Sequence, residues 1–506
     1  MFRPLYSILV FLFFAGIVHG AIIFVPDDYP TIQGAIDAAA STDVVAVRAG
    51  TYVENIDFNG KDITVISVDG AATTTIDGGG LGSVVTFANG EGPDSIIDGF
   101  TLTNGYTTTY LVGGGVHCAG TSPTVRNNRI VKNHSDYEGG GVLCIHTGTA
   151  LIENNLIEDN WAHDGAGVSC MWGGDATIIG NDISLNTADN GAGIHCNGAA
   201  PLIQGNRIYG NDTQVFNGGG INLGDSSPLI VDNLIFANLA GWFGGGIYAD
   251  YDSAPTITNN TIYNNSSDGG GGIYCKGNTS TITVANTILW YNYALTGPEI
   301  YVGAAGEPGD LSIDFSDVYG GQASCHVESG STLTWGLNNI DADPLMADAG
   351  GDDFHLTYNS PCRDAGANNA PGVTSVDFEG DPRIVSSTID MGADEFYYHL
   401  YYTGRIIPGN TITIKAIGLP GFGVRLGTHN ALQDPPQSTQ HGDLHLETPL
   451  LGDWPLGAVP GDGLFVFSTT VPTSWTSGEK WHFQALVGQW GHPYTRITNL
   501  MTMTTE

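Results

Sequence analysis

Seven glycine-rich phrases recur through the middle of the chain at a nearly constant interval. The third residue of each phrase is glycine, and successive copies lie 26 residues apart, once 27. These residues are Gly115, Gly141, Gly167, Gly193, Gly220, Gly246 and Gly272. Such a period is typical of a solenoid, in which each repeat forms one coil and buries its apolar side against neighbouring coils. The register therefore limits the architecture to a repeat array and leaves the chemistry open.

The composition fits a folded array and excludes some partners. At 506 residues the chain is longer than one compact core usually supports. It carries 52 acidic and 15 basic residues, which gives a net charge of −37. This charge repels nucleic-acid phosphates and anionic lipid surfaces, so we expect neither as a partner. We expect a monomer.

The N-terminus has the pattern of a secretory signal peptide over residues 1–20. Arg3 precedes an apolar stretch from Ile8 to Val18, and Val18-His19-Gly20-Ala21 is a small-residue cleavage pattern. The stretch is short for a membrane span, and no later run of about 18 apolar residues follows it. The sequence thus predicts an exported, soluble protein without a membrane span.

A strand follows each glycine phrase, and its alternation predicts which side chains are buried. Two columns should point inward. The first is Val116, Val142, Val168, Ile194, Ile221, Ile247 and Ile273. The second is Cys118, Cys144, Cys170, Cys196, Leu223, Ala249 and Cys275. The column between them should face solvent. It contains His117, Leu143, Ser169, His195, Asn222, Tyr248 and Tyr274.

A second strand in each coil is marked by Asn-x-Ile with another Asn a few residues later. The copies begin at Asn128, Asn155, Asn181, Asn206, Asn233 and Asn260 and end at Asn133, Asn160, Asn186, Asn211, Asn238 and Asn265. Because Asn tolerates left-handed backbone and can hydrogen-bond a stacked copy, we place both columns at bends. Leucine-rich repeats have a similar period but need a helical segment, and calcium-binding nonapeptide repeats are far shorter. The pattern predicts an all-β parallel β-helix.

The two ends of the array have patterns of their own. Residues 29–36 carry apolar side chains at helical spacing with Pro30 near the start, which predicts a helix that caps the first coil. With the less regular early coils included, we place the β-helix and its N-terminal cap at residues 21–320. Alternating stretches between Gly and Pro turns predict a small C-terminal β-sandwich domain at residues 399–506.

Ordered motifs outside the repeats resemble a known family. They are Val25-Pro26 with Val47-Arg48-Ala49-Gly50-Thr51-Tyr52, Asp343-Pro344-Leu345, Asp353-Phe354-His355-Leu356, Ser360-Pro361-Cys362-Arg363-Asp364-Ala365-Gly366, Asp381-Pro382-Arg383 and Asp390-Met391-Gly392-Ala393-Asp394-Glu395. Over residues 22–396 the chain resembles bacterial secreted right-handed parallel β-helix proteins of the pectin-lyase-like superfamily. Residues 321–398 look like their choice-of-anchor Q segment. The resemblance implies a secreted or surface-associated bacterial protein, usually without an assigned activity.

The cysteines raise the hypotheses of a metal site, a disulfide zipper or buried free thiols. Adjacent rungs of a β-helix are about 4.8 Å apart, but stacked side chains run parallel and keep their Cβ atoms too far apart for a disulfide. Leu223 and Ala249 occupy the same column, so we favour free thiols packed as small hydrophobic groups. Cys325 and Cys362 lie outside the column, and a disulfide between them stays open in an exported chain.

Charged residues near the second strand could form either rung-to-rung ion pairs or a catalytic set. Aligning the Asn columns places Arg126 beside Glu153, Lys132 beside Asp159 and Asp182 beside Arg207. Opposite-sign neighbours favour surface ion pairs, each worth about 0.2–1 kcal/mol.

Two outward columns are the candidate binding surface. One contains His117, Ser169, His195, Asn222, Tyr248 and Tyr274, and the other, just before the glycine phrases, contains Glu138, Asp164, Asn190 and Asn217. Side by side they would form a groove of aromatic, imidazole and carboxylate groups suited to sugars, with Trp161, Trp172 and Trp242 as added stacking surface. The alternative is an ordinary solvated strand face.

Acidic clusters after the coils raise the hypothesis of structural calcium. They are Asp341, Asp343, Asp348, Asp352 and Asp353, and then Asp377, Glu379 and Asp381. Carboxylate oxygens are calcium ligands, but the regular loop of an EF-hand is missing, so we favour ion pairing of Arg383 with Asp377 or Asp390. The histidines show no metal-ligating spacing, and no other cofactor is indicated.

Three functions are open on these grounds. The one we favour is a secreted or cell-surface β-helix that binds a polysaccharide or cell-surface glycan. The second is a lyase or hydrolase acting on acidic polysaccharide, because pectate lyases of the superfamily use carboxylate-held calcium and a basic residue. The Arg motifs of the lyases and the signature stretches of pectinesterases and polygalacturonases are not found here, which lowers this hypothesis. The third is a structural spacer.

Overall fold

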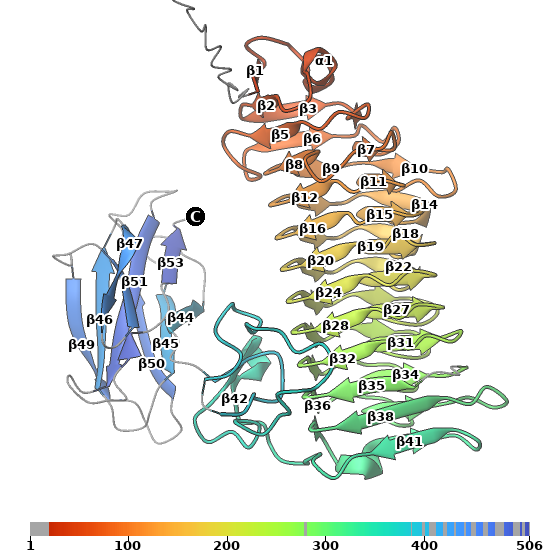
Figure 1. The fold of residues 1–506 in the computed structure, drawn as a ribbon, viewed down its shortest axis with the longest axis vertical. Coiled ribbons are helices and arrows are strands. Elements are labelled where there is room, and N and C mark those ends of the chain that lie inside the picture. The colour runs from red at the N-terminus through yellow and green to blue at the C-terminus, as the bar shows by residue number, and fades with distance from the viewer. Residues whose placement is uncertain are drawn as a thin grey trace, which may run out of the picture.

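Three long parallel sheets form the walls of a β-solenoid (Figure 1). The computed structural model describes residues 20–277, 281–385 and 387–396, and the backbone of strands after residue 400. Sheet A contains β1 (Ile22–Val25), β2 (Val44–Val47), β5 (Thr64–Ser67), β8 (Ile96–Asp98), β12 (Thr124–Arg126), β16 (Leu151–Glu153), β20 (Thr177–Ile179), β24 (Leu202–Gln204), β28 (Leu229–Val231), β32 (Thr256–Thr258), β35 (Ile282–Ala285), β38 (Asp310–Asp314) and β41 (Thr332–Trp335). Sheet B contains β3 (Gly50–Val53), β6 (Thr74–Asp77), β9 (Thr101–Thr103), β13 (Arg129–Val131), β17 (Leu156–Glu158), β21 (Asp182–Ser184), β25 (Arg207–Tyr209), β29 (Leu234–Phe236), β33 (Thr261–Tyr263), β36 (Ile288–Trp290) and β39 (Asp317–Val318). Sheet C contains β4 (Ile56–Asp57), β7 (Val85–Phe87), β11 (Val116–Ala119), β15 (Val142–Ile145), β19 (Val168–Met171), β23 (Ile194–Asn197), β27 (Ile221–Gly224), β31 (Ile247–Asp250), β34 (Ile273–Cys275), β37 (Ile300–Val302) and β40 (Cys325–Val327).

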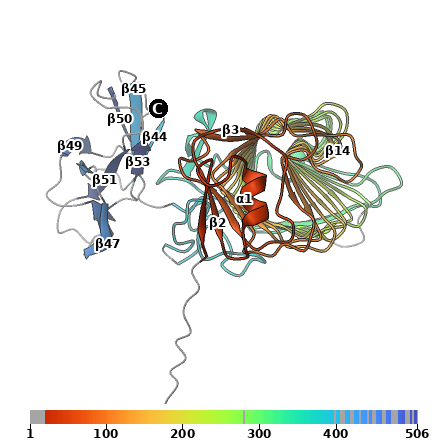
Figure 2. The same cartoon turned by 90° about the horizontal axis from the view of Figure 1, so that it is seen from above.

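A fourth, shorter sheet forms between sheets B and C of the middle coils, and the sequence patterns did not predict it. Sheet D contains β10 (Tyr106–Thr107), β14 (His134–Glu138), β18 (Trp161–Asp164), β22 (Thr187–Asn190), β26 (Asp212–Thr213) and β30 (Leu239–Ala240). Each middle coil therefore runs through sheets A, B, D and C in that order. Seen along the axis, β14 and β2 lie on opposite sides of the coil (Figure 2).

The predicted inward columns form the core. Val116 pairs with Val142 and Val142 with Val168, and these three side chains are fully buried. At the N-terminal end, helix α1 (Ile32–Ala38) overlaps the region predicted to be helical, residues 29–36, and Thr31 accepts a hydrogen bond from the backbone N–H of Gly34. Its buried side chains join the same apolar core, so the core continues from α1 along the solenoid.

Both Asn columns form buried hydrogen-bonded ladders, as predicted. In one rung, Asn155 Nδ2 donates to Asn181 Oδ1 at 3.0 Å and to the carbonyl of Val125 at 2.9 Å. The backbone N–H of Asn155 also donates to Asn181 Oδ1. The second ladder ends at Asn292, whose side chain and backbone N–H both donate to Glu299. The left-handed backbone lies one residue before the predicted positions. Asn154 and Asp159 have positive φ, and each directly precedes a ladder residue.

The rung-to-rung charges follow the predicted register but not every predicted pair. Arg126 lies beside Glu153, yet its guanidinium contacts Asp98 on the preceding coil at 2.8 Å. Arg207 Nε lies 4.0 Å from Asp182, as predicted. Such half-exposed pairs contribute little to stability.

All seven cysteines are free thiols. The inward Cys column is buried, which confirms the packing interpretation. The disulfide that the sequence left open between Cys325 and Cys362 is not formed, and the two thiols belong to different apolar clusters. Cys325 packs against the solenoid core, whereas the Cys362 thiol donates to Asp317 Oδ2 at 3.2 Å.

Residues 341–396 form a separate layer on the outside of sheet B. The solenoid continues past the predicted boundary at residue 320, since β40 and β41 extend sheets C and A. A short helix, η1 (Gly321–Ser324), precedes β40, and after β41 the layer contains the hairpin of β42 (Met346–Asp348) and β43 (Asp353–Leu356) with the short helix η2 (Ala349–Gly351) between them. Phe354 packs against Phe236 of β29 with 4.8 Å between ring centroids.

Arg383 forms its ion pair with the solenoid and not with the acidic residues of its own layer. We expected it to pair with Asp377 or Asp390, and that is wrong. Its guanidinium contacts Asp232, between β28 and β29, and both side chains are about 1% exposed. Asp377 instead accepts backbone N–H groups of Glu379, Asp381 and Glu395.

Beyond residue 400 the strands pair in antiparallel sheets. They are β44 (Leu400–Thr403), β45 (Thr411–Ile417), β46 (Gly423–His429), β47 (Leu432–Thr439), β48 (Gly442–Leu446), β49 (Gly452–Ala458), β50 (Leu464–Thr470), β51 (Lys480–Gly488), β52 (Arg496–Ile497) and β53 (Met501–Thr504). The predicted sandwich packing of this region lies outside the residues whose side chains the structure describes.

Candidate functional site

The outer face of sheet C is buried, although the sequence predicted it to be exposed. The residues concerned are His117, Ser169, His195, Asn222, Tyr248 and Tyr274, whose exposed fractions lie between 0 and 8%. The expectation that this column meets a ligand in solvent is therefore wrong.

The glycine phrases themselves cover this face. Gly165 has a φ of 67°, and a Cβ atom on it would lie 2.7 Å from the Cβ of Ser169 and 3.0 Å from that of His195. Gly139 approaches Leu143 in the same way. Only glycine lets the backbone turn and come this close. The turn between sheets D and C thus folds back over the outward side chains of sheet C.

The two histidines of the buried column are uncharged at neutral pH. Burial lowers the pKa of His117 to about 4 and also lowers that of His195, so both imidazoles are neutral. Tyr248 donates to Asp250 Oδ2 at 2.9 Å and stacks on Tyr274 with centroids 5.3 Å apart. These contacts pack the wall of the solenoid.

The second predicted column forms a polar ladder at the edge of sheet D. Glu138, Asp164 and Asn190 stack in register, and Asn190 Nδ2 donates to Asp164 Oδ1 at 3.0 Å. Asn217 continues the ladder through its backbone N–H, which donates to Asn190 Oδ1. Glu138 is 5% exposed, and burial raises its pKa. Asp164 is the more accessible carboxylate of the two.

A partly exposed row of aromatic side chains runs along the outside of sheet D. Tyr106, His134 and Trp161 occupy equivalent positions on successive strands. The ring centroids of His134 and Trp161 are 4.3 Å apart and nearly parallel, and those of Tyr106 and His134 are 4.9 Å apart. The row continues through Thr187, Asp212 and Leu239. We call this surface the sheet D face.

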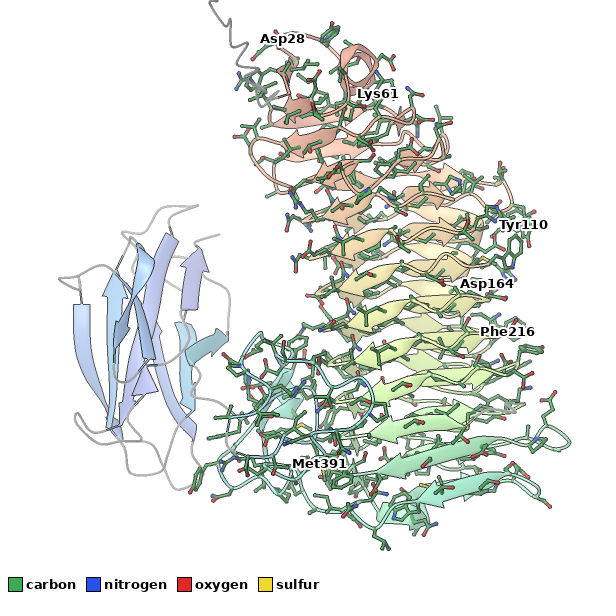
Figure 3. All side chains as sticks on the ribbon, viewed as in Figure 1. Asp28, Lys61, Tyr110, Asp164, Phe216 and Met391 are labelled. Atoms are coloured by element: carbon green, nitrogen blue, oxygen red, sulfur yellow. The ribbon has the colours of Figure 1, made fainter. Side chains whose placement is uncertain are left out.

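Carboxylates lie beside the aromatic row. Asp136 Oδ1 lies 2.9 Å from His134 Nε2 and accepts from the hydroxyl of Tyr106 at 3.3 Å. On the next coils, His163 lies between Asp164 at 3.1 Å and Asp189 at 3.5 Å. Tyr110, Asp164 and Phe216 mark this edge of the solenoid in Figure 3.

An open hollow of about 470 Å³ continues the face toward the C-terminal coils. Its lining includes Asp212, Gln214, Leu239, Asp268, Tyr293 and Leu295. Leu239 and Tyr293 are 45% and 62% exposed, so their apolar surfaces are open to a ligand. The hollow combines apolar and acidic groups, which suits sugar rings better than a purely charged ligand.

The sequence contained a signal for this face that the pattern search missed. From His134 onward, each outward side chain of the row directly follows the second Asn of its coil, as in Asn133-His134, Asn160-Trp161 and Asn292-Tyr293, whereas Tyr106 follows Gly105. The Asn side chain is buried in its ladder, and the residue after it begins the next strand with its side chain outward. Sheet D was hidden because its strands are short and polar.

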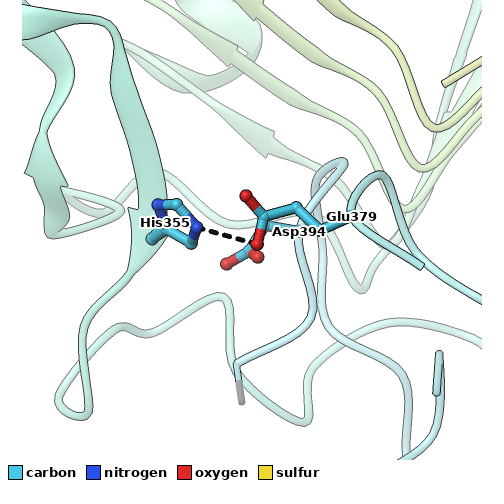
Figure 4. A group of neighbouring side chains, drawn as sticks. All are labelled: His355, Glu379 and Asp394. Carbon is cyan, nitrogen blue, oxygen red and sulfur yellow. Dashed lines mark ion pairs between the residues drawn. The ribbon is translucent and has the colours of Figure 1, made fainter. Parts of the chain in front are cut away.

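A second cluster lies within residues 341–396 (Figure 4). Ligand atoms of His355, Glu379 and Asp394 all lie within 4.8 Å of one another. His355 Nδ1 is 2.6 Å from Asp353 Oδ1, and His355 Nε2 is 3.0 Å from Glu379 Oε2. Burial lowers the pKa of His355, but Glu379 and Asp353 outweigh it and hold that pKa well above its usual value.

The acidic clusters for which calcium was a hypothesis make the following contacts in the structure. Asp341 accepts the backbone N–H of Gly320, and Asp343 accepts that of Leu345. Glu379 Oε2 lies 3.0 Å from His355 Nε2.

Known proteins support the architecture. The family described as right handed beta helix region matches residues 114–289 and 173–340. The solenoid is a right-handed β-helix. No curated protein matches the chain. Within the part of the β-helix protein that the structure describes, no helix combines the length and apolar character needed to cross a bilayer.

Proposed function

We propose that the β-helix binds a neutral polysaccharide along the sheet D face. The observation that carries the proposal is the partly exposed, in-register row of Tyr106, His134 and Trp161 beside Asp136 and Asp189. Because His134 and Trp161 stack on each other, they offer the edges of their rings as apolar contact to a sugar, and carboxylates accept hydrogen bonds from its hydroxyls. The aromatic rungs, about 4.8 Å apart, follow one another along the axis, the direction in which a polymer can extend.

The charge of the surface favours a neutral glycan over an acidic one. The chain carries a net charge of −37, and the sheet D face adds Asp136, Asp189 and Asp212 at the site itself. An acidic polysaccharide would be repelled over long range and at contact. This argues against the acidic polysaccharide of the lyase hypothesis as the natural ligand.

Replacing Trp161 by alanine tests the proposal. The ring is the largest of the aromatic row and stacks on His134, so Trp161→Ala should weaken binding of a neutral oligosaccharide at least tenfold, about 1.4 kcal/mol. Glycan arrays identify the ligand, and titration calorimetry measures its dissociation constant. Trp172→Ala is the matched control, because Trp172 is 43% exposed but lies after β19, away from sheet D. The control should bind like the wild type.

Three outcomes would contradict the proposal. Equal affinity in Trp161→Ala and the wild type would place the ligand elsewhere. No binding to neutral, amino-sugar or acidic polymers would favour a structural spacer. New reducing or unsaturated ends from a polysaccharide would favour the enzyme hypothesis.

We also propose that the chain is exported and works outside a bacterial cell. The pattern of residues 1–20 and the resemblance over residues 22–396 support this proposal. In the same scheme, α1 protects the first coil and residues 399–506 form a β-sandwich. N-terminal sequencing of exported protein should begin at Ala21, and an intact Met1 on the exported chain would contradict the cleavage.

A further inference from the structure

Three side chains from distant parts of the outer layer converge on one point. His355 lies on β43, Glu379 lies in the turn after Phe378, and Asp394 lies near the end of the layer. One ligand atom of each residue lies within 4.8 Å of those of the other two, and the imidazole and the two carboxylates lie close together in Figure 4.

Asp353 orients the imidazole of His355. Its carboxylate lies 2.6 Å from Nδ1, so that nitrogen carries the hydrogen and Nε2 is directed at Glu379. A carboxylate behind the histidine and further carboxylates in front of it are the usual surroundings of a metal-bound imidazole. The Nε2 lone pair and the Glu379 carboxylate need a cation between them, either a proton or a metal ion.

A small cavity adjoins the cluster. It has a volume of about 40 Å³, and its lining includes His355, Glu379 and Asp394 together with Phe354 and Arg207. This volume admits a water molecule beside an ion, which would complete a site with three protein ligands.

We propose that His355, Glu379 and Asp394 bind a zinc ion. One imidazole nitrogen and two carboxylates suit Zn²⁺, whereas Ca²⁺ takes six to eight oxygen ligands. The ion joins β43 to the two turns that also carry Arg383 and Ala393. It therefore secures the outer layer, whose Phe354 packs on sheet B of the solenoid.

Metal content and thermal stability of the full chain test the proposal. Protein purified without chelator and dialysed should retain one equivalent of zinc by elemental analysis. EDTA should remove it and lower the Tm, and Zn²⁺ should restore the Tm whereas Ca²⁺ should not. Glu379→Gln keeps the shape of the side chain and should lose the zinc-dependent shift.

His326→Gln is the matched control. His326 also faces a carboxylate, with Nε2 3.3 Å from Glu328, but it lies at the surface on β40. This variant should keep one zinc and the full shift in Tm. Absence of zinc together with a Tm unchanged by EDTA and Zn²⁺ would overturn the proposal and leave a protonated His355. A shift with Ca²⁺ alone would overturn the choice of zinc.

Discussion

Arg383→Met should lower the free energy of unfolding of the outer layer by about 3–5 kcal/mol, the range for removing one partner of a buried ion pair. Arg383 contacts Asp232 where both side chains are about 1% exposed, and its Nη2 also donates to the carbonyl of Ala393 at 2.9 Å. The substitution leaves the Asp232 carboxylate buried without its cation. Urea unfolding followed by fluorescence, with limited proteolysis of residues 341–396, measures the loss.

The loss should depend on pH. Burial raises the pKa of Asp232 to about 6, and the charge of Arg383 acts against this rise. Because this pKa is above the unfolded value of about 3.9, protonation favours the folded state, and this contribution is lost as the pH rises through 6. Without Arg383 the pKa rises further, so the variant should be less destabilised at pH 5 than at pH 8.

Two variants serve as controls for this prediction. Arg48→Met removes a similar ion pair with Asp27, but both side chains are about half exposed, so the loss should stay below about 1 kcal/mol. Asp232→Asn combined with Arg383→Met should recover part of the lost stability, because no charge is left buried. Equal effects of Arg383→Met and Arg48→Met would show that burial does not decide the contribution.

Gly167→Ala should destabilise the solenoid by about 3 kcal/mol or more. A Cβ atom at this position would lie 2.4 Å from the carbonyl oxygen of Gly193 on the next coil and 2.9 Å from Ile183. The closest atom belongs to the backbone, which is held in the parallel ladder and cannot move aside alone. Thermal and urea unfolding measure the change.

Gly224→Ala is the matched control for this prediction. Gly224 also lies on sheet C, and the nearest atom to an added Cβ is 3.6 Å away, an ordinary contact. We expect a change within about 0.5 kcal/mol. If Gly167→Ala were as mild, the glycine phrase would not be required by close packing between coils.

The glycine period predicted the coils because close packing between neighbouring coils requires a glycine at the same position of every coil. The inward column from Val116 and the ladder through Asn155 follow from the same rule, since each repeats with the coil. Regularity of this kind is visible in sequence, so the solenoid and its core could be predicted.

The predicted binding surface on sheet C was wrong for a physical reason. Strand alternation correctly assigned Ser169 and His195 to the outer side of sheet C, but it could not show that the glycine turn folds back on them. Outward from a sheet is not the same as exposed to solvent. At the level of the sequence, the glycines served only as a marker of the repeat period. Gly165 also packs over the side chains of Ser169 and His195 and shields them from solvent.

Contacts between the solenoid and the outer layer could not be predicted from local patterns. Arg383 and Asp232 are 151 residues apart, and their pairing depends on how the layer docks against sheet B. His355, Glu379 and Asp394 were likewise assigned to separate motifs. Their meeting depends on the fold of the layer and not on their spacing.

Sheet D is limited in length, and this has a consequence for recognition. Sheets A, B and C have 11 or more strands, whereas sheet D has six and continues only through single bridges at Ser266 and Tyr293. These eight rungs at about 4.8 Å span about 34 Å. A polymer lying along the axis therefore gains contacts only up to this length. The affinity should therefore rise with the length of the oligomer and stop rising once the oligomer is longer than this face.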